Sequence, residues 1–252
     1  MKLSIIVPAL NEEKNILSTI DNCLSALNEF NIDGEIVVIN DGSSDSTPNL
    51  VGKKIKENPG RVRTLLHEKP MGIGFSFWDG VDNALGESVV MIPGDNENDP
   101  KEILRYFNLL NDVDIVVPFV YNKEVRSLSR NALSSFFTFF INFVFSTNFK
   151  YTNGTNLYRR SLLKELKRRS GSFFFQADIL IRLAGKGYLF AEVPYKLNLR
   201  RGGNSKLISF RSFLKVAKEC LHLFWEANFK KGKIKNDFFS QDSLTALRKK
   251  KD

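Results

Sequence analysis

Short apolar runs alternate with stretches of helical periodicity along the first half of the chain. Five runs of apolar and β-branched residues, each ended by polar or turn-forming residues, predict buried strands: Leu3–Val7, Glu35–Asn40, Val62–Leu66, Ser88–Ile92 and Val113–Val117. The segments between them predict helices, one with Ile16, Ile20, Leu24 and Leu27 at helical spacing and the others at Leu50–Glu57, Gly74–Leu85 and Lys101–Leu110. Strand, loop and helix in repeated order are typical of an α/β fold whose parallel sheet has helices on both faces.

The loops after these strands are polar, and open α/β sheets bind ligands outside the carboxyl ends of their strands. Asn11, after the first strand, is expected to cap the first helix. Asp41, after the second strand, can accept a hydrogen bond from a nucleoside, although Asp-Gly is also an ordinary turn. Gly72 and Gly74 resemble a phosphate-approach loop, but the same pattern is more often a turn before a helix.

The stretch Glu87–Pro100 carries the candidate chemistry. Its strand ends at Pro93, and Asp95, Glu97 and Asp99 then alternate with asparagines. Hard oxygen donors suit Mg²⁺ or Mn²⁺, and Mg²⁺ takes only one or two protein carboxylates beside water and substrate phosphate. The alternative is an acidic turn before a helix, with Asp99 as N-cap and the following proline as the first helical residue. The stretch alone does not decide between them.

Charge divides the chain into an acidic and a basic half. Residues 1–120 hold 10 Lys and Arg against 19 Asp and Glu, and residues 121–252 hold 27 against 9. A metal-binding half joined to a basic half suggests a substrate with several anionic groups or an anionic partner surface. We do not expect nucleic acid as the partner, because no zinc-finger spacing, aromatic RNA-binding motif or helix-turn-helix pattern accompanies the basic residues.

Cysteine positions and apolar run lengths bear on the compartment. Cys23 and Cys220 lie far apart in apolar contexts, which favours core packing in a reducing compartment over a disulfide. The first apolar run is interrupted at Asn11 and the longest, Phe136–Phe145, is well under the ~20 residues needed to cross a bilayer. We therefore expect neither a signal peptide nor a membrane span.

The basic half contains two aromatic segments of helical pattern. Arg126 and Arg130 are four residues apart and are expected to share one helical face, either to match phosphate or simply as a solvated face. Ser134–Ser146, which follows, is apolar all round, so it must be buried in a core, an oligomer or lipid. Phe210–Phe229 predicts a basic amphipathic helix, suited to an anionic membrane surface or to packing on the main domain. The basic residues after it predict a mobile tail.

Several motifs occur together in a fixed order: IIVPALNEEKNI, VINDGSSDST, GIGFSFWDGVDNALGESVVMIPGDNENDP and EVPYKLNLRRGGNSKL. Over about residues 3–206 the chain resembles glycosyltransferase family 2, especially the dolichyl-phosphate mannose synthase-like and polyprenyl-phosphate glycosyltransferase branch. The resemblance implies a GT-A fold with a Rossmann-like nucleotide-binding half, a nucleotide-diphosphate sugar donor, a divalent metal (Mg²⁺ or Mn²⁺) and inversion at the anomeric carbon.

By motif position the resemblance also implies site residues. It places the nucleoside among Pro8, Ala9, Asn11, Glu12 and Asp41, to which we add Gly72 from the glycine loop. Asp95 and Glu97 fall at the metal and diphosphate, with Asp95 also counted as catalytic. Asp178 falls near the acceptor as a general base, an orienting carboxylate or the N-terminal charge of a helix. Phosphates of donor or acceptor are assigned to Arg126, Arg130, Arg200, Arg201, Ser205 and Lys206.

One departure concerns the metal. The first aspartate of the family's usual DXD motif falls on Pro93, and Glu97 stands where many relatives carry glutamine. We interpret this as an altered metal site, because a carboxylate gained nearby can replace one that is lost in a hard-cation site.

The sequence thus predicts a GT-A domain over residues 1–206, divided into a donor and metal half (1–120) and an acceptor half (121–206). A basic amphipathic helix (207–235) and a basic tail (236–252) follow. The expected function is an inverting, metal-dependent transfer of a sugar to a polyprenyl phosphate, on the cytoplasmic, inner face of a membrane. Two alternatives stay open: transfer to a glycan hydroxyl, and a nucleotide-sugar or lipid-binding homologue without turnover. The nucleotide, the sugar and a homo-oligomeric state also stay open.

Overall fold

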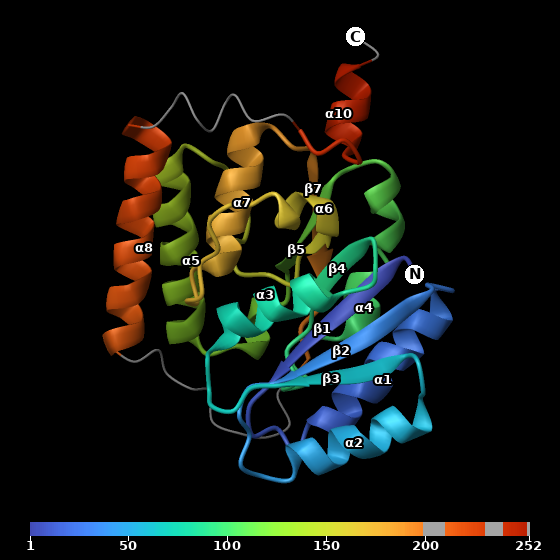
Figure 1. Ribbon diagram of the computed structural model, residues 1–252. Helices are drawn as coiled ribbons and strands as arrows, with labels where there is room; N and C mark the ends of the chain where they lie inside the picture. Colours follow the sequence, from blue (N-terminus) through green and yellow to red (C-terminus); the bar gives the residue numbers. More distant parts are fainter. Residues whose placement is uncertain (199–209, 230–238, 251–252) are drawn as a thin grey trace.

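The expected strands and helices form, with bounds close to those of the hydrophobic pattern. The computed structural model describes residues 1–198, 210–229 and 239–250 (Figure 1). The strands are β1 (Leu3–Ala9), β2 (Gly34–Asn40), β3 (Val62–Leu66), β4 (Ser88–Met91), β5 (Ile115–Val120), β6 (Leu157–Arg159) and β7 (Phe190–Tyr195). The helices are α1 (Ile16–Glu29), α2 (Thr47–Glu57), α3 (Ile73–Asn83), α4 (Pro100–Leu104), α5 (Leu128–Phe145), α6 (Arg160–Lys164), α7 (Phe175–Lys186), α8 (Phe210–Phe229) and α10 (Leu244–Lys249).

One mostly parallel sheet runs through both predicted halves of the domain. The strand order is β3-β2-β1-β4-β6-β5-β7. β1 pairs in parallel with β2 and β4, so that Ile5 lies between Ile36 and Val90. Parallel pairing continues between β2 and β3 and between β5 and β7, while β6 is antiparallel to both of its neighbours. β6, from residues 121–206, lies between β4 and β5 of residues 1–120, so the two predicted halves interleave in one sheet.

Helices cover both faces of the sheet because alternate strand residues point to opposite sides. Ile5 packs in a cluster with Ile20 of α1, whereas its neighbour Ile6 packs in a second cluster with Phe77 of α3. At Gly80 of α3 an added Cβ would lie 2.4 Å from the Ile6 side chain, so α3 can approach β1 this closely only without a side chain there.

Two local expectations differ from the structure and one is confirmed. Asn11 does not cap the first helix: α1 begins after Asn15, and Asn11 lies in a preceding loop with φ of 56°. The helix predicted over Lys101–Leu110 divides into α4 and a 3₁₀ helix, η1 (Phe107–Asn111). Asp99 does cap α4, since its carboxylate accepts from the Lys101 amide at 2.9 Å.

Helices α5, α7 and α8 lie side by side at one side of the molecule (Figure 1), and α7 also packs on the sheet through Ile179 and Leu183. They share a small buried cluster of Ile141, Phe174, Ala177, Ile181, Cys220 and Leu223. Of the three predicted surroundings of α5, the core of this chain does not enclose it, because Phe136, Phe139, Phe140 and Phe143 are exposed. On α8 the side predicted to be apolar is likewise turned outward, with Leu214, Leu221, Phe224 and Trp225 exposed.

Within the described part of the chain, no helix combines the length and the apolar character that spanning a membrane requires.

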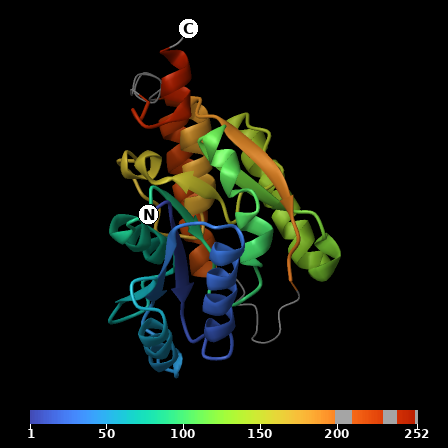
Figure 2. The same ribbon diagram turned by 90° about the vertical axis from the view of Figure 1, so that its right-hand side faces the viewer.

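Residues 239–250 are held against the sheet, contrary to the mobile tail that was predicted around Arg248, whereas Lys230–Lys235 lie outside the described residues. Asp114, which is fully buried, accepts from the Leu244 and Thr245 amides at 2.7 and 3.1 Å and also from the Thr245 hydroxyl. Lys249 lies over the Phe239 ring, which packs on Tyr188. The first turn of α10 is thus capped by a carboxylate that is far away in sequence. In both views α10 lies at the opposite end of the molecule from α2 (Figures 1 and 2).

Asp114→Asn should loosen α10, because an amide nitrogen cannot accept the hydrogen bonds that the second carboxylate oxygen accepts. We expect a loss of about 1–2 kcal/mol, as for other helix caps, and faster amide hydrogen exchange over residues 239–250. Asp112→Asn is the control, since Asp112 is exposed and binds Arg248 through its backbone carbonyl. Equal exchange in the two variants would contradict the capping role.

Candidate active site

The loops after β1 and β2 are joined by hydrogen bonds at the carboxyl edge of the sheet. The Asn11 amide donates to Ser43 Oγ at 3.0 Å, and Asn11 Oδ1 accepts from the Ser44 amide at 2.8 Å. The Glu12 amide donates to Thr47 Oγ1 at 2.9 Å. Asn11 and Glu12 therefore lie together beside Pro8 and Ala9 at the end of β1, in one loop pair, as the motif positions imply.

Asp41 occupies the centre of a cluster that the sequence did not reveal. Its Oδ1 accepts from the Met71 amide and lies 2.7 Å from His67 Nδ1, and its Oδ2 accepts from the Gly72 amide at 2.9 Å. His67 Nε2 lies 2.7 Å from Asp79 on α3. The Gly72 amide is thus engaged by Asp41. The signal that could have indicated the cluster is a histidine directly after a strand, at the edge where the other site residues gather.

The Asp95 loop is held next to the end of β1. The Gly94 amide donates to the Pro8 carbonyl at 3.0 Å, and an added Cβ at Gly94 would lie 3.2 Å from that oxygen. Asp95 Oδ1 accepts from the Glu97 amide at 3.1 Å, and Asn96 between them adopts a φ of 58°. The backbone therefore turns sharply at Asn96 and brings the predicted metal loop beside the predicted nucleoside loops.

Glu97 forms an ion pair with a residue of the acceptor half. It is 5% exposed, and its two carboxylate oxygens lie 3.3 and 3.1 Å from the two terminal nitrogens of Arg130. The hydrogen bond to Glu97, followed by the charges of Glu97, Tyr151 and Asp95, raises the pKa of Arg130. The structure thereby joins the predicted metal loop to one of the predicted phosphate ligands.

The residues present fit a metal that is held jointly with substrate. Among the described residues, no three His, Cys, Asp or Glu side chains lie close enough together to hold an ion by themselves. Asp95 supplies one carboxylate at the strand edge, and hard cations that bind substrate phosphates often take only one or two from the protein. Glu97, the other predicted ligand, is bound to Arg130, so it would have to release Arg130 in order to bind a metal ion.

Arg126 does not share a helical face with Arg130, contrary to expectation. Ser127 is the N-cap of α5, with its Oγ accepting from the Arg130 amide at 3.4 Å, so Arg126 lies outside the helix in an extended conformation. Its terminal nitrogen donates to the Tyr151 hydroxyl at 3.3 Å. Its Nε is buried and has no hydrogen-bond partner among the described residues, which is costly unless a ligand or water supplies an acceptor.

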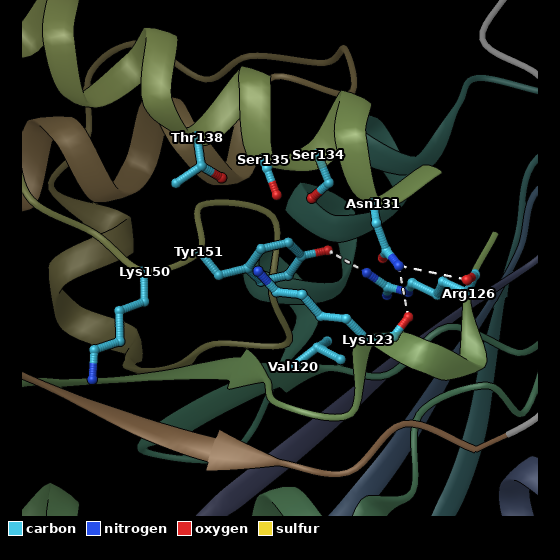
Figure 3. Close-up of a pocket in the computed structure, with 9 residues that line it drawn as sticks. All are labelled: Val120, Lys123, Arg126, Asn131, Ser134, Ser135, Thr138, Lys150 and Tyr151. Carbon is cyan, nitrogen blue, oxygen red and sulfur yellow. Dashed lines mark hydrogen bonds between the residues drawn. The ribbon is translucent and has the colours of Figure 1, made fainter. Parts of the chain in front are cut away.

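A pocket beneath α5 surrounds Arg126 with a further cation and hydroxyl groups. Figure 3 shows Ser134, Ser135 and Thr138 pointing from α5 towards Tyr151. The remaining lining residues are Val120, Lys123, Asn131 and Lys150. Lys150 points away from Arg126, with its Nζ over the Phe119 ring (Figure 3). The two cationic side chains of Arg126 and Lys123 and the four hydroxyl groups suit an anion rich in acceptor oxygens. The sequence analysis identified only Arg126 of this set, since the other members come from three separate segments.

Asp178, in the first turn of α7, faces Arg182 of the same helix and Glu219 of α8. It is 4% exposed, its Oδ1 accepts from Arg182 at 3.0 Å, and its Oδ2 has no hydrogen-bond partner among the described residues. Burial raises its pKa to about 6, opposed by Arg182 and Arg168, and the like charge of Glu219 on α8 adds to the rise. None of these groups belongs to the Asp95 loop.

Arg200, Arg201, Ser205 and Lys206 lie outside the described residues. The last described residue before them, Asn198, donates from its amide to the Glu97 carbonyl at 3.0 Å.

The chain is similar to known proteins over most of its length. Residues 4–167 match the model of glycosyl transferase family 2. The chain is 27% identical over 241 residues to a dolichyl-phosphate beta-glucosyltransferase from Dictyostelium discoideum, covering 88% of this chain and 73% of that protein. It is 24% identical over 170 residues to a dodecaprenyl-phosphate galacturonate synthase from Rhizobium johnstonii, covering 66% of this chain and 50% of that protein.

Solved structures show the same architecture. Glucosyl-3-phosphoglycerate synthase from Mycobacterium tuberculosis in complex with UDP superposes with a TM-score of 0.65 at 19% identity, over 89% of this chain and 79% of that one. The same protein has been solved with Mn²⁺, UDP and glucosyl-3-phosphoglycerate, with a TM-score of 0.62 at 20% identity, over 89% of this chain and 79% of that one. These likenesses confirm the predicted GT-A fold, and because the family model covers more than half of the sequence, the chain belongs to glycosyltransferase family 2.

Proposed function

We propose that this glycosyltransferase moves a sugar, with inversion, from a nucleotide-diphosphate sugar to the phosphate of a polyprenyl phosphate. The observation that carries the proposal is the pocket beneath α5, in which the buried Nε of Arg126 has no hydrogen-bond partner among the described residues and Lys123 adds positive charge. The helix that forms one wall of this pocket also exposes phenylalanines. An acceptor with an anionic head and an apolar tail would engage both features.

The names of two relatives point to the same class of acceptor. The curated proteins from Dictyostelium and Rhizobium are named for dolichyl and dodecaprenyl phosphates. A phosphate monoester has a second pKa of about 6, so it is largely dianionic near neutral pH and is already a nucleophile. It needs cations to hold and orient it, and the pocket offers Arg126 and Lys123 for that task.

The donor would bind at the carboxyl edge of the sheet, with its nucleoside among Pro8, Ala9, Asn11, Glu12 and Asp41. A divalent metal, when bound, would stabilise the negative charge of the departing nucleoside diphosphate. Asp95 is the residue that we propose to hold it. Arg130 lies near both Asp95 and the pocket around Tyr151, so its charge can stabilise phosphate groups of donor or acceptor.

Transfer to a glycan hydroxyl is less well supported. A hydroxyl group near neutral pH needs a positioned general base, and the candidate for that role was Asp178. Asp178 is buried, and the charged groups around it are Arg182, Arg168 and Glu219. The phosphate acceptor does not require this residue as a base.

The protein is proposed to act at the cytoplasmic face of an anionic membrane as a peripheral enzyme. Exposed apolar side chains lie on two neighbouring helices, with Phe139 and Phe143 on α5 and Leu221 and Trp225 on α8. Contiguous apolar surface is uncommon on proteins that remain in water. Lys215 and Lys218 on α8 provide the charge that anionic lipids attract.

The metal assignment can be tested with two aspartates of one loop. Asp95→Asn should weaken Mn²⁺-dependent binding of UDP or GDP by at least tenfold in calorimetry, because a ligand of the ion is lost. Asp99→Asn is the matched control, since Asp99 caps α4 and its loss should cost only about 1 kcal/mol of stability. Equal losses of nucleotide binding in the two variants would contradict the assignment.

The acceptor assignment can be tested by steady-state transfer of labelled sugar to a short-chain polyprenyl phosphate. Arg126→Ala should raise the KM for that acceptor about 10- to 100-fold, the effect of losing charge-assisted hydrogen bonds, and leave the donor KM nearly unchanged. Arg105→Ala, at an exposed ion pair with Glu102, is the control.

Asp178→Asn distinguishes the two acceptor classes in the same assay. For a phosphate acceptor we expect the limb of the pH-rate profile near pH 6 to persist, because Asp178, with a pKa of about 6, is not the base. A 10²- to 10⁴-fold loss of transfer to a panel of sugar acceptors, together with no transfer to any prenyl phosphate, would favour the glycan alternative.

Membrane association can be measured by sedimentation with anionic liposomes. We expect binding at low salt and release as salt rises, because surface charges are screened within ~8 Å at physiological ionic strength. Replacing Phe139 and Phe143 with serine should reduce binding, whereas serine at the exposed Leu66 and Leu85, outside α5 and α8, should not. Equal binding of all variants would contradict a role for the exposed face of α5.

A further inference from the structure

His67 lies between two carboxylates and hydrogen-bonds to both. Its Nδ1 is 2.7 Å from Asp41 Oδ1 and its Nε2 is 2.7 Å from Asp79 Oδ2. An ionised carboxylate only accepts hydrogen bonds, and a neutral imidazole has only one N–H group. Both bonds can exist together only when the ring is doubly protonated. The geometry therefore describes an imidazolium held between two acids.

The surroundings of the ring favour that charge. The ionisable groups that face it are Asp41, from the end of β2, and Asp79, from α3. No other charged side chain of residues 1–198, 210–229 or 239–250 forms a hydrogen bond or ion pair with it. Burial alone would lower the pKa of His67, and the hydrogen bonds to Asp41 and Asp79 outweigh it, so the pKa is raised above the ordinary value.

The imidazolium contributes to the orientation of the Asp41 carboxylate. Asp41 Oδ1 is shared by His67 and the Met71 amide, and Oδ2 accepts from the Gly72 amide. A carboxylate can accept about four hydrogen bonds, so one position, on Oδ2, remains for a ligand. Asp41 is buried, with 7% of its side chain exposed, whereas Asp79 is half exposed and reaches Asp41 only through the ring.

We infer that His67 and Asp79 are positioning residues, which hold the Asp41 carboxylate so that it can accept an N–H or O–H group of the donor's nucleoside. This rests on the proposed function, in which Asp41 contacts that nucleoside. Donor binding then depends on the proton of His67. The cluster is complete below the ordinary histidine pKa and persists until the pH rises through the raised pKa of the folded protein. Above that, one of the two hydrogen bonds is lost and the carboxylates repel each other.

The charge state can be measured first, by NMR of the ring nitrogens. The chain has two histidines, so His222→Gln leaves His67 as the single imidazole to observe. We expect both nitrogens of His67 to carry protons at neutral pH and to titrate above the ordinary histidine value. Asp79→Asn should move that titration to lower pH. A neutral ring at pH 7 would overturn the inference without involving any nucleotide.

The consequence for binding can be measured by calorimetry with UDP and with GDP, each with MnCl₂, between pH 6 and pH 9. The wild-type affinity for the nucleotide that binds should fall with rising pH in step with the NMR titration. His67→Gln should bind about tenfold more weakly at pH 6.5, as expected for the loss of one charge-assisted hydrogen bond, and its affinity should vary little with pH. Asp79→Asn, at a half-exposed site on α3, should show an intermediate loss if His67→Gln fails to fold.

The two failures are distinguishable. Nucleotide binding with the same affinity and the same pH dependence in wild type, His67→Gln and Asp79→Asn would overturn the positioning role and leave the proposed function intact. Failure of the wild-type protein to bind either nucleotide at any pH would overturn both.

Discussion

The parallel pairing of β1 with β2 on one edge and with β4 on the other determines where the chemistry can occur. Two loops begin with a hydrogen bond to the end of β1: the Asp41 amide donates to the Ala9 carbonyl at 2.9 Å and the Gly94 amide to the Pro8 carbonyl at 3.0 Å. β1 is buried on both faces, so a shift of its register by one residue would exchange two apolar sets. The spacing between the Asp41 loop and the Asp95 loop is therefore set by the sheet and its core packing.

The acceptor half is tied to that edge by two different means. β6 pairs antiparallel with β4 and continues the sheet, which is rigid and independent of charge. The Glu97–Arg130 ion pair acts at the site itself, between the β4 loop and the start of α5. Glu97 is buried but 43% of the Arg130 side chain is exposed, so the pair adds little net stability, although removing Arg130 would take away a charge that offsets the buried carboxylate. The pair is thus better suited to setting the position of Arg130 than to stabilising the fold.

The strands and most helices could be predicted because apolar periodicity and cap residues are local signals. The Asp99 cap spans two residues, whereas His67 joins Asp41 and Asp79 across 26 and 12 residues. No periodicity specifies such contacts, because they depend on which loops the topology brings together. Arg126 was wrongly predicted to lie in the helix of Arg130 for another reason. Ser127 is a strong N-cap residue, and this local signal places the start of the helix after Arg126.

Which sides of α5 and α8 are buried could not be predicted from the sequence either, because it depends on tertiary packing. Each helix has apolar residues on more than one side, and the cluster between α5, α7 and α8 uses Ile141, Cys220 and Leu223. Phe137 and Phe145 of α5 pack against this cluster, whereas Phe139 and Phe143 of α5 and Trp225 of α8 are exposed. Arg182 lies at the same junction and bridges Asp178 to Glu226, so polar contacts supplement a small apolar interface between α7 and α8.

The position of α5 relates the proposed acceptor to this exposed surface. One side of the helix lines the cationic pocket through Ser134, Ser135 and Thr138, and another exposes Phe139 and Phe143. Burying apolar surface gains roughly 25 cal/mol for each Å², so the phenylalanines would gain from lipid what they do not obtain from the core. An acceptor whose phosphate enters the pocket would then keep its prenyl tail on the apolar side of the same helix, without the tail crossing the polar edge of the sheet.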